Sequence, residues 1–268
     1  MSDPARGDSR EALLGVAVEA ARTAGALLLE RFQEGAERAL ASKSTPTDLV
    51  SEADLASQRV IRALLAERRP DDGFLGEEEG EDEPGSSGLR WVVDPLDGTV
   101  NFLFAIPQWC VSVAVQDREG SLAGAIFDPN RGELFTAVRG GAPALNGTKI
   151  VASARTELAT AMVATGLAYD ARVRALQARV LARLIPQVRD LRRFGSAALD
   201  LAWTAAGRYD AYFERSVKEW DIAAGTLICE AAGLRTVELP DHPELPPGIL
   251  VAAPALAAPL LELVGVEE

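Results

Sequence analysis

The N-terminal part of the chain contains two stretches in which apolar residues recur at helical spacing. Over 11–32 the apolar positions return every three or four residues, which predicts a long amphipathic helix that Gly35 can close. A polar segment with one proline, 42–49, then interrupts the pattern. Helical spacing resumes over 51–69 and ends before Pro70. We therefore expect a polar loop held between two helices.

The next residues change to the short apolar runs that are typical of strands. Two runs, 74–76 and 90–93, flank an acidic loop rich in glycine, serine and proline, 77–88, so each strand has acids at its end. Over 110–139, apolar runs alternate with Gly, Asp and Asn breaks. This alternation predicts a meander of antiparallel hairpins.

After Asn146-Gly147 the pattern alternates between helical and strand-like segments. Helices are predicted near 172–185, 196–206 and 219–232, and strands near 160–165, 209–213 and 234–238. The weakly charged run 246–261 is broken by prolines and too short to span a bilayer, so we expect a buried strand followed by a short helix. With no repeat and no long linker, we expect a single domain over 1–268, with an α+β half about 1–150 and an α/β half about 151–268.

Composition narrows the choice of partners and compartment. The chain has 40 Asp plus Glu against 27 Lys plus Arg, a net charge of −13, which disfavours nucleic acid and anionic membranes as main partners. Cys110 and Cys229 lie far apart and offer no disulfide framework. The N-terminus lacks the basic-then-apolar layout of a signal peptide. We expect a cytoplasmic protein.

A single histidine, His242, limits the hydrolytic chemistry that the chain can perform. A Ser-His-Asp triad would have to recruit it from a turn-like stretch without a matching nucleophile motif. Zinc sites built on two or three histidines are impossible. Any hydrolytic chemistry must use carboxylates, hydroxyls and metal.

The segment from Asp94 to Thr99 brings two carboxylates to one sharp turn. An apolar strand ends on Asp94, Pro95 and Gly98 force the turn, and Thr99 can cap a new helix. Magnesium prefers hard oxygen ligands, and exposed backbone N–H groups at a helix start accept phosphate oxygens. A surface Asx-type turn with incidental acids is the alternative.

Other acids each have an ordinary structural explanation as well. Glu77 follows an apolar strand and could face a metal, although an acidic run is usually a solvated loop. Asp54 stands three residues after Ser51, the spacing of a capping box. Asp221 falls in the first turn of a predicted helix, where the dipole favours a negative charge in any protein.

Taken together, these segments resemble the signatures of the inositol monophosphatase family. The resemblance is carried, in order along the chain, by Lys43-Ser44-x-x-x-Asp48-Leu49-Val50-Ser51-x-x-Asp54, Gly76-Glu77-Glu78, Trp91-x-x-Asp94-Pro95-Leu96-Asp97-Gly98-Thr99-x-Asn101-Phe102 and Trp220-Asp221-x-Ala223-Ala224-Gly225. It implies a layered αβαβα sandwich and a homodimer. It also implies two Mg²⁺ ions, with a weaker third.

The resemblance assigns the metal ligands position by position. The first ion would be held by Glu77, Asp94 and the backbone carbonyl of Leu96. The second would be held by Asp94, Asp97 and Asp221. A metal-activated water, oriented by Glu77 and by Thr99, would attack phosphorus, and Asp54 would position the Thr99 hydroxyl.

The resemblance also implies which residues bind the substrate. The N–H groups of Gly98 and Thr99 would hold phosphate oxygens. The alcohol would be contacted by three further residues: Ser196, Glu214 and Asp221. Lys43 would belong to a loop near the metals.

Three functions remain open at this point. The first is hydrolysis of inositol 1-phosphate or a related sugar-alcohol phosphate, and the second is the same chemistry on histidinol phosphate, fructose 1,6-bisphosphate or a 3′-phosphonucleotide. The third is a metal-binding scaffold that acts through protein partners. A cysteine-based phosphatase is disfavoured, because the Cys229-x-x-x-x-x-Arg235 spacing puts the thiol near the end of a helix, where the dipole does not lower its pKa.

Overall fold

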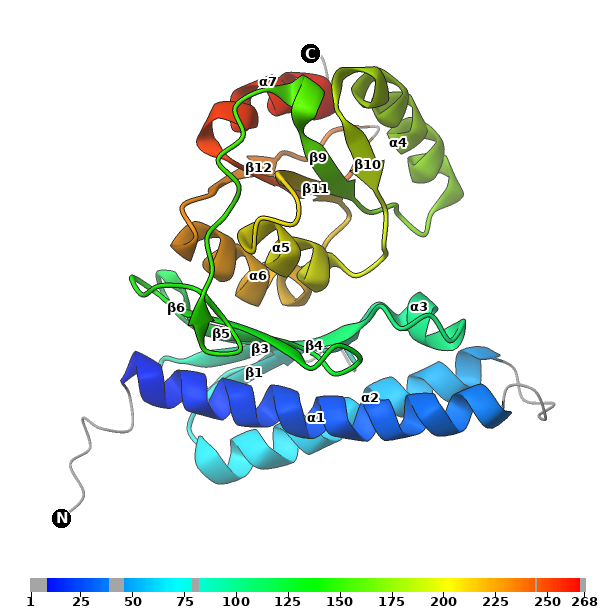
Figure 1. The fold of residues 1–268 in the computed structure, drawn as a ribbon. Coiled ribbons are helices and arrows are strands. Elements are labelled where there is room, and N and C mark those ends of the chain that lie inside the picture. The colour runs from blue at the N-terminus through cyan, green and yellow to red at the C-terminus, as the bar shows by residue number, and fades with distance from the viewer. Residues whose placement is uncertain (1–8, 39–45, 79–81, 244, 266–268) are drawn as a thin grey trace.

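Two long helices form one outer layer of the molecule. In the computed structural model, which describes residues 9–38, 46–78, 82–243 and 245–265, they are α1 (Arg10–Arg38) and α2 (Pro46–Arg68). They pack against each other and against the first sheet (Figure 1). The predicted pair of helices is therefore confirmed.

The first sheet lies directly on these helices. In the described residues it has eight strands in the order β2-β1-β3-β4-β5-β6-β7-β8. Their bounds are β1 (Gly73–Gly76), β2 (Asp82–Glu83), β3 (Arg90–Asp97), β4 (Cys110–Asp117), β5 (Gly120–Asp128), β6 (Glu133–Val138), β7 (Ala144–Leu145) and β8 (Thr148–Lys149). All neighbouring pairs are antiparallel except β1 with β3, so the predicted meander of hairpins is confirmed.

A second pair of helices separates this sheet from another. Helices α5 (Ala197–Ala205) and α6 (Glu219–Ala231) pack against each other, with α6 over β4 and β5 of the first sheet and α5 against β11 of the second. The short helix α3 (Thr99–Leu103) directly follows β3 and packs against α2. The middle helices thus contribute to the packing of both sheets.

The second sheet combines parallel and antiparallel pairing. Its described strands run in the order β10-β9-β11-β13-β12, with β10, β9 and β11 parallel and β13 and β12 antiparallel. Their bounds are β9 (Met162–Thr165), β10 (Asp190–Arg192), β11 (Ala211–Arg215), β12 (Arg235–Leu239) and β13 (Gly248–Ala252). The parallel strands end together at one edge of the sheet, and this edge faces the first sheet's Asp94–Asp97 turn across the cavity described below.

Helices α4 (Ala171–Leu184) and α7 (Pro254–Val264) form the last layer, with one-turn 3₁₀ helices at Leu158–Thr160 and Ile185–Gln187. The order of layers in Figure 1 is therefore helices, sheet, helices, sheet, helices. The predicted αβαβα sandwich is confirmed.

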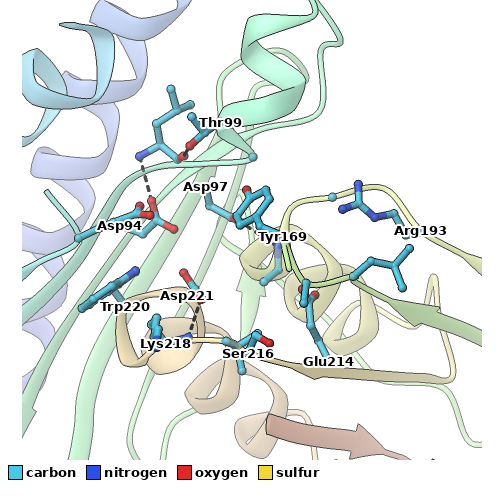
Figure 2. A pocket seen from close by; sticks show the side chains of 18 residues that line it. Asp94, Asp97, Thr99, Tyr169, Arg193, Glu214, Ser216, Lys218, Trp220 and Asp221 are labelled. Atoms are coloured by element: carbon cyan, nitrogen blue, oxygen red, sulfur yellow. Dashed lines mark hydrogen bonds between the residues drawn. The ribbon is translucent and has the colours of Figure 1, made fainter. Parts of the chain in front are cut away.

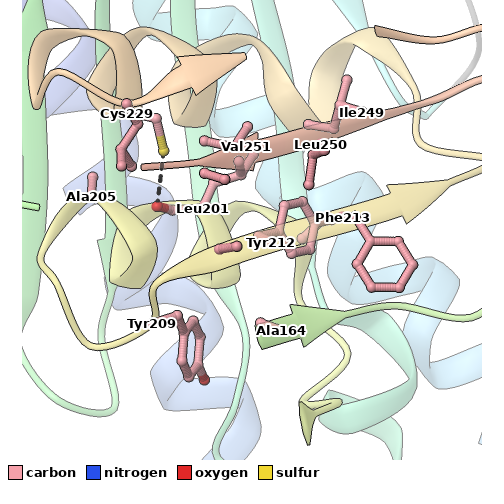
Figure 3. Close-up of a cluster of buried hydrophobic side chains, with 14 of the residues drawn as sticks. Ala164, Leu201, Ala205, Tyr209, Tyr212, Phe213, Cys229, Ile249, Leu250 and Val251 are labelled. Carbon is pink, nitrogen blue, oxygen red and sulfur yellow. Dashed lines mark hydrogen bonds between the residues drawn. The ribbon is translucent and has the colours of Figure 1, made fainter. Parts of the chain in front are cut away.

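Two apolar clusters hold the layers together. One lies between α1, α2 and the first sheet, and the other extends through α5 and α6 into the second sheet and α7. Figure 3 shows part of the second cluster, which includes Leu201 of α5, Cys229 of α6 and Val251 of β13. Burial of these apolar side chains is the main stabilising contribution to this part of the fold.

Helix α1 is the one described helix that is long and apolar enough to cross a membrane by length and composition. Its apolar face is instead packed in the first cluster. The buried residues of this face are Leu13, Ala17, Ala20, Ala21, Ala24 and Leu28. Such a pattern is typical of a core helix in a layered fold.

The start of α2 differs from the prediction. The helix begins at Pro46 instead of position 51, and proline is well suited to the first helical position because its missing N–H needs no partner there. Asp54 consequently lies inside the helix, well after its first turn, and is buried. The capping-box interpretation of Ser51 and Asp54 is therefore wrong.

Candidate active site

The turn that carries Asp94 and Asp97 interrupts the regular pairing of β3 with β4. The register shifts between these two residues, so their side chains leave the regular ladder. The Asp94 Oδ1 accepts a hydrogen bond from the Leu96 N–H at 3.0 Å, which is an Asx-type turn bond. Asp94 is however only 1 % exposed. The alternative of a surface turn with incidental acids is therefore wrong.

Gly98 ends this turn in a conformation that favours glycine. Its φ is 97°, and a Cβ there would lie 2.8 Å from the carbonyl oxygen of Gln108. Gly98 itself is the N-cap of α3, and Thr99 is the first helical residue. The Thr99 hydroxyl donates to the Leu96 carbonyl oxygen at 3.0 Å. The prediction that Thr99 caps the helix is wrong, because the left-handed glycine occupies the cap position.

Asp97 is held by residues from the other half of the chain. Its carboxylate accepts hydrogen bonds from the Ser196 hydroxyl at 2.5 Å, the Ala197 N–H at 3.2 Å and the Ala198 N–H at 2.7 Å. Ser196 is the N-cap of α5 but its hydroxyl points to Asp97. The first turn of α5 is thereby joined to the Asp94–Thr99 turn across the middle of the molecule.

Three more of the predicted acids reach the same place from different elements. Glu77 directly follows β1, and its N–H bonds to the Val93 carbonyl of β3 at 3.2 Å. Asp221 lies in the first turn of α6, where its Oδ2 accepts the Lys218 N–H at 2.6 Å. Glu214 comes from β11.

A cavity of about 280 Å³ brings these side chains together (Figure 2). Five carboxyl groups line it: Glu77, Asp94, Asp97, Glu214 and Asp221. Two cationic side chains, Arg193 and Lys218, line it as well. Leu96, Gly98 and Thr99 line it too, whereas the predicted Ser196 and Asp54 do not, and the Ser196 hydroxyl is bonded to Asp97 instead. The wall is therefore acidic overall, and an anion such as phosphate needs a further positive charge to bind there.

Burial and mutual repulsion perturb the carboxyl groups strongly. Burial, and then the charges of the neighbouring carboxylates, raise the pKa of Asp94 well above its usual value. Burial raises the pKa of Glu77 to about 7 and that of Asp221 to about 8. Burial also raises the pKa of Asp97, although its hydrogen bonds from Ser196 and α5 oppose the shift. Such a cluster is typical of a functional site that is completed by a cation.

The donor set fits magnesium. Carboxylates and a backbone carbonyl are the hard oxygen ligands that Mg²⁺ uses in proteins, and no cationic side chain forms an ion pair with the described Glu77, Asp94 or Asp97. In the part of the chain that the structure describes, no three Asp, Glu, His or Cys side chains are already spaced as ligands of one ion. Asp94, Asp97 and Asp221 each accept at least one hydrogen bond from a backbone N–H group.

Asp54 is close to this cluster without the predicted contact to Thr99. It is 2 % exposed, and its Oδ1 has no hydrogen-bond partner among the described residues. Burial, then the charges of Glu78 and Glu77, raise its pKa to about 8. The predicted bond from the Thr99 hydroxyl goes to Leu96 instead. A buried oxygen without a hydrogen-bond partner needs an explanation, and a water or metal ion bound in the site would supply the missing partner of Asp54.

Other predictions fall outside the cavity. Lys43 lies outside the described residues. His242 forms a β-bridge with Leu245 and does not line the cavity. The Cys229 thiol donates to the Leu201 carbonyl at 3.2 Å, and burial raises its pKa. A buried thiol with a raised pKa is a poor nucleophile, as expected from its place near the end of α6.

Among the lining residues that sequence reasoning missed are one aromatic and two cationic side chains. Tyr169 and Arg193 follow β9 and β10, whose carboxyl ends meet at one edge of the second sheet. Only the sheet topology reveals this proximity. Lys218 immediately precedes α6, three residues before Asp221, and this short spacing could have marked it.

The layered fold and the cavity lined by buried carboxylates define the structural class, and comparison with known proteins specifies the family. The model of the inositol monophosphatase family matches residues 9–264. The chain belongs to the inositol monophosphatase family.

Individual relatives agree with this assignment. An inositol-1-monophosphatase of Rhizobium meliloti is 44 % identical over 228 residues, which is 84 % of this chain and 85 % of that protein. A protein of Pasteurella multocida named Nus factor SuhB is 40 % identical over 90 % of this chain and 91 % of its own length. The solved structure of an inositol monophosphatase from Anabaena superposes with a TM-score of 0.82 at 31 % identity and covers 95 % of each chain.

Proposed function

We propose that this chain is a Mg²⁺-dependent phosphatase that hydrolyses a small phosphate monoester, with inositol 1-phosphate as its substrate. The observation that carries the proposal is the group of buried carboxylates in the cavity, whose pKa values are raised by burial and mutual repulsion. Support comes from relatives that are named inositol-1-monophosphatase.

The metal ligands in this proposal are side chains that already face the cavity. Glu77, Asp94, Asp97, Asp221 and the carbonyl of Leu96 would hold two Mg²⁺ ions, with Glu77 also serving a weaker third. Bound Mg²⁺ supplies positive charge to the phosphate and lowers the pKa of water. No histidine is needed for this chemistry.

The chain's own residues would orient the reactants. Hydrogen bonds from Ser196 and the first turn of α5 fix the Asp97 carboxylate, so it cannot rotate freely. The Thr99 hydroxyl, held now at the Leu96 carbonyl, lies beside the carboxylates and would orient the attacking water together with Glu77. Glu214 and Asp221 would contact the alcohol that leaves. Precise placement of these groups lowers the barrier by reducing the entropy lost on reaching the transition state.

A substrate panel tests the proposal. Phosphate release is measured with and without Mg²⁺ for inositol 1-phosphate, histidinol phosphate, fructose 1,6-bisphosphate and a 3′-phosphonucleotide. The highest kcat/KM should be found for inositol 1-phosphate, since specificity is a difference in transition-state binding. Glu77→Gln should abolish turnover of every substrate. A higher kcat/KM for another member of the panel would show that this member, and not inositol 1-phosphate, is the preferred substrate. The phosphatase assignment would still hold.

A second candidate function, that of a scaffold acting through protein partners, is favoured by one surface. Helix α4 carries four exposed arginines and no acid, in a protein of net charge −13: Arg172, Arg174, Arg179 and Arg183. The name Nus factor SuhB, given to two of the relatives, is consistent with a second role in those proteins. A pull-down with Asp97→Asn protein, with and without Arg179→Glu, tests this function, which fails if nothing specific is retained.

The homodimer that the family resemblance implies also belongs to the proposal. Two exposed aromatic side chains, Phe104 (72 % exposed) and Phe194 (39 % exposed), support it. Asn101 joins their loops, because its Nδ2 donates to the carbonyls of Gln108 and Phe194 at 2.7 Å. Exposed apolar surface of this kind is common at subunit contacts. Light scattering on the purified protein should give twice the mass of one chain, and a monomer would contradict it.

A further inference from the structure

Glu214 forms the wall of the cavity on the side away from Asp94 (Figure 2). Its Oε2 accepts a hydrogen bond from the Tyr212 hydroxyl at 2.7 Å. Tyr212 and Glu214 are two residues apart on β11, so their side chains leave the strand on the same face. Tyr212 is fully buried, at 0 % exposure. The hydroxyl that holds Glu214 is therefore part of the core and cannot move aside easily.

The backbone of Gly166 holds the same carboxyl group from the other side. A Cβ at position 166 would lie 1.9 to 2.0 Å from the three carboxyl atoms of Glu214. No other residue type leaves room for Glu214 in this position. Gly166 follows β9, which pairs with β11, so the close approach is a product of the parallel sheet. Glu214 is wedged between a core hydroxyl and a bare backbone.

The positive charge of Arg193 acts on Glu214, but no salt bridge joins the two side chains among the described residues. In the part of the chain that the structure describes, none of the salt bridges includes Glu214, and the Tyr212 hydroxyl is its one hydrogen-bond donor. Burial raises the pKa of Glu214 to about 7, and the bond from Tyr212 opposes this shift. Because Tyr212 takes Oε2, the Oε1 atom of this cavity-lining residue has no hydrogen-bond donor among the described residues. A hydroxyl group of a ligand is a suitable donor to it.

We propose that Tyr212, with Gly166, is a positioning residue that fixes Glu214 as the acceptor for a hydroxyl of the leaving alcohol. The Tyr212 hydroxyl should therefore matter for esters whose leaving alcohol has a hydroxyl to donate and not for esters whose leaving group has none. A buried acceptor that its ligand leaves unpaired penalises binding, which is how such a site discriminates. This inference rests on the proposed phosphatase function and adds the basis of substrate choice.

The test compares two substrates in three proteins. Inositol 1-phosphate offers hydroxyl groups on its leaving alcohol, whereas p-nitrophenyl phosphate offers none. Tyr212→Phe removes one hydroxyl and no bulk. Tyr209→Phe is the matched control, because Tyr209 is also buried and its hydroxyl has no partner among the described residues.

The expected result is a selective loss. Tyr212→Phe should lower kcat/KM for inositol 1-phosphate about tenfold, mostly through KM, because a hydrogen bond to a charged group is lost. Its kcat/KM for p-nitrophenyl phosphate should stay within about twofold of wild type, and Tyr209→Phe should change neither substrate. If Tyr212→Phe does not fold, Glu214→Gln, which keeps the size of the side chain, is measured on inositol 1-phosphate, for which kcat/KM should fall about tenfold.

Two results would overturn the proposal. An equal loss on both substrates would show that Tyr212 acts through general packing, and no loss on either would show that Glu214 needs no positioning. Failure of the proposed function looks different, since wild-type protein would then release phosphate from neither substrate.

Discussion

Replacing Asp200 with asparagine should stabilise the protein at neutral pH. Asp200 lies in the first turns of α5, is 1 % exposed, and neither of its carboxyl oxygens has a hydrogen-bond partner among the described residues. Burial, and then the negative charges of Glu214 and Asp97, raise its pKa well above the ordinary 3.8. The folded protein therefore keeps this carboxyl protonated at a pH where the unfolded chain ionises it.

The magnitude follows from this difference in proton binding. Because the folded pKa is raised, the stability associated with the group is complete below pH 3.8 and is lost as the pH rises toward the folded pKa. Each pH unit in that window lowers the free energy of unfolding by about 1.4 kcal/mol. Asparagine removes this pH-dependent loss but buries an amide that also lacks a partner, so we expect the variant to gain on the order of 1 kcal/mol over wild type at pH 7.

Urea unfolding of wild type and Asp200→Asn at pH 4 and pH 7, without added metal, measures the effect. The advantage of the variant should be present at pH 7 and small or reversed at pH 4. Asp190→Asn is the control, because Asp190 is exposed and pairs with Arg192, so its replacement should change stability by less than about 0.5 kcal/mol. An advantage that is equal at both pH values, or absent at pH 7, would refute the reasoning.

Three further predictions concern the site itself. Gly98→Ala should lower the free energy of unfolding by about 1 to 3 kcal/mol more than Gly88→Ala in urea titrations, since both have positive φ but only Gly98 would place a Cβ against the Gln108 carbonyl. Ser196→Ala should lower kcat/KM about tenfold, because Asp97 loses its hydroxyl donor; unchanged kinetics would show that the α5 amides suffice. Adding Mg²⁺ to chelated protein should raise Tm by mass action, and a Tm that does not move at saturating Mg²⁺ would argue against a metal site.

The helices were predictable because their apolar period is strong. Helices α4, α5 and α6 begin and end within one residue of the predicted ranges. The predicted start of α2 was wrong because Ser51 and Asp54 have the spacing of a capping box. Pro46 is equally compatible with a loop and with a first helical position. Local signals that fit two structures cannot be resolved without the tertiary packing.

The same limit applies to the site. Asp94 and Asp97 share one short turn, so their proximity was visible in the sequence. Arg193 and Tyr169 enter the cavity only because β9 and β10 are parallel neighbours, and pairing of this kind has no local signal. The predicted cap by Thr99 failed because Gly98 adopts a left-handed conformation, which leaves the Thr99 hydroxyl free to bond Leu96.

The central claim is that the buried carboxylates hold the Mg²⁺ on which phosphate hydrolysis depends. The most direct measurement is the rate of phosphate release from inositol 1-phosphate as Mg²⁺ is added back to chelated protein, for wild type and Asp94→Asn. Wild type should be inactive in EDTA and recover with Mg²⁺, and Asp94→Asn should remain inactive or need far more Mg²⁺. Full activity in EDTA, or an unchanged Mg²⁺ dependence in Asp94→Asn, would contradict the claim.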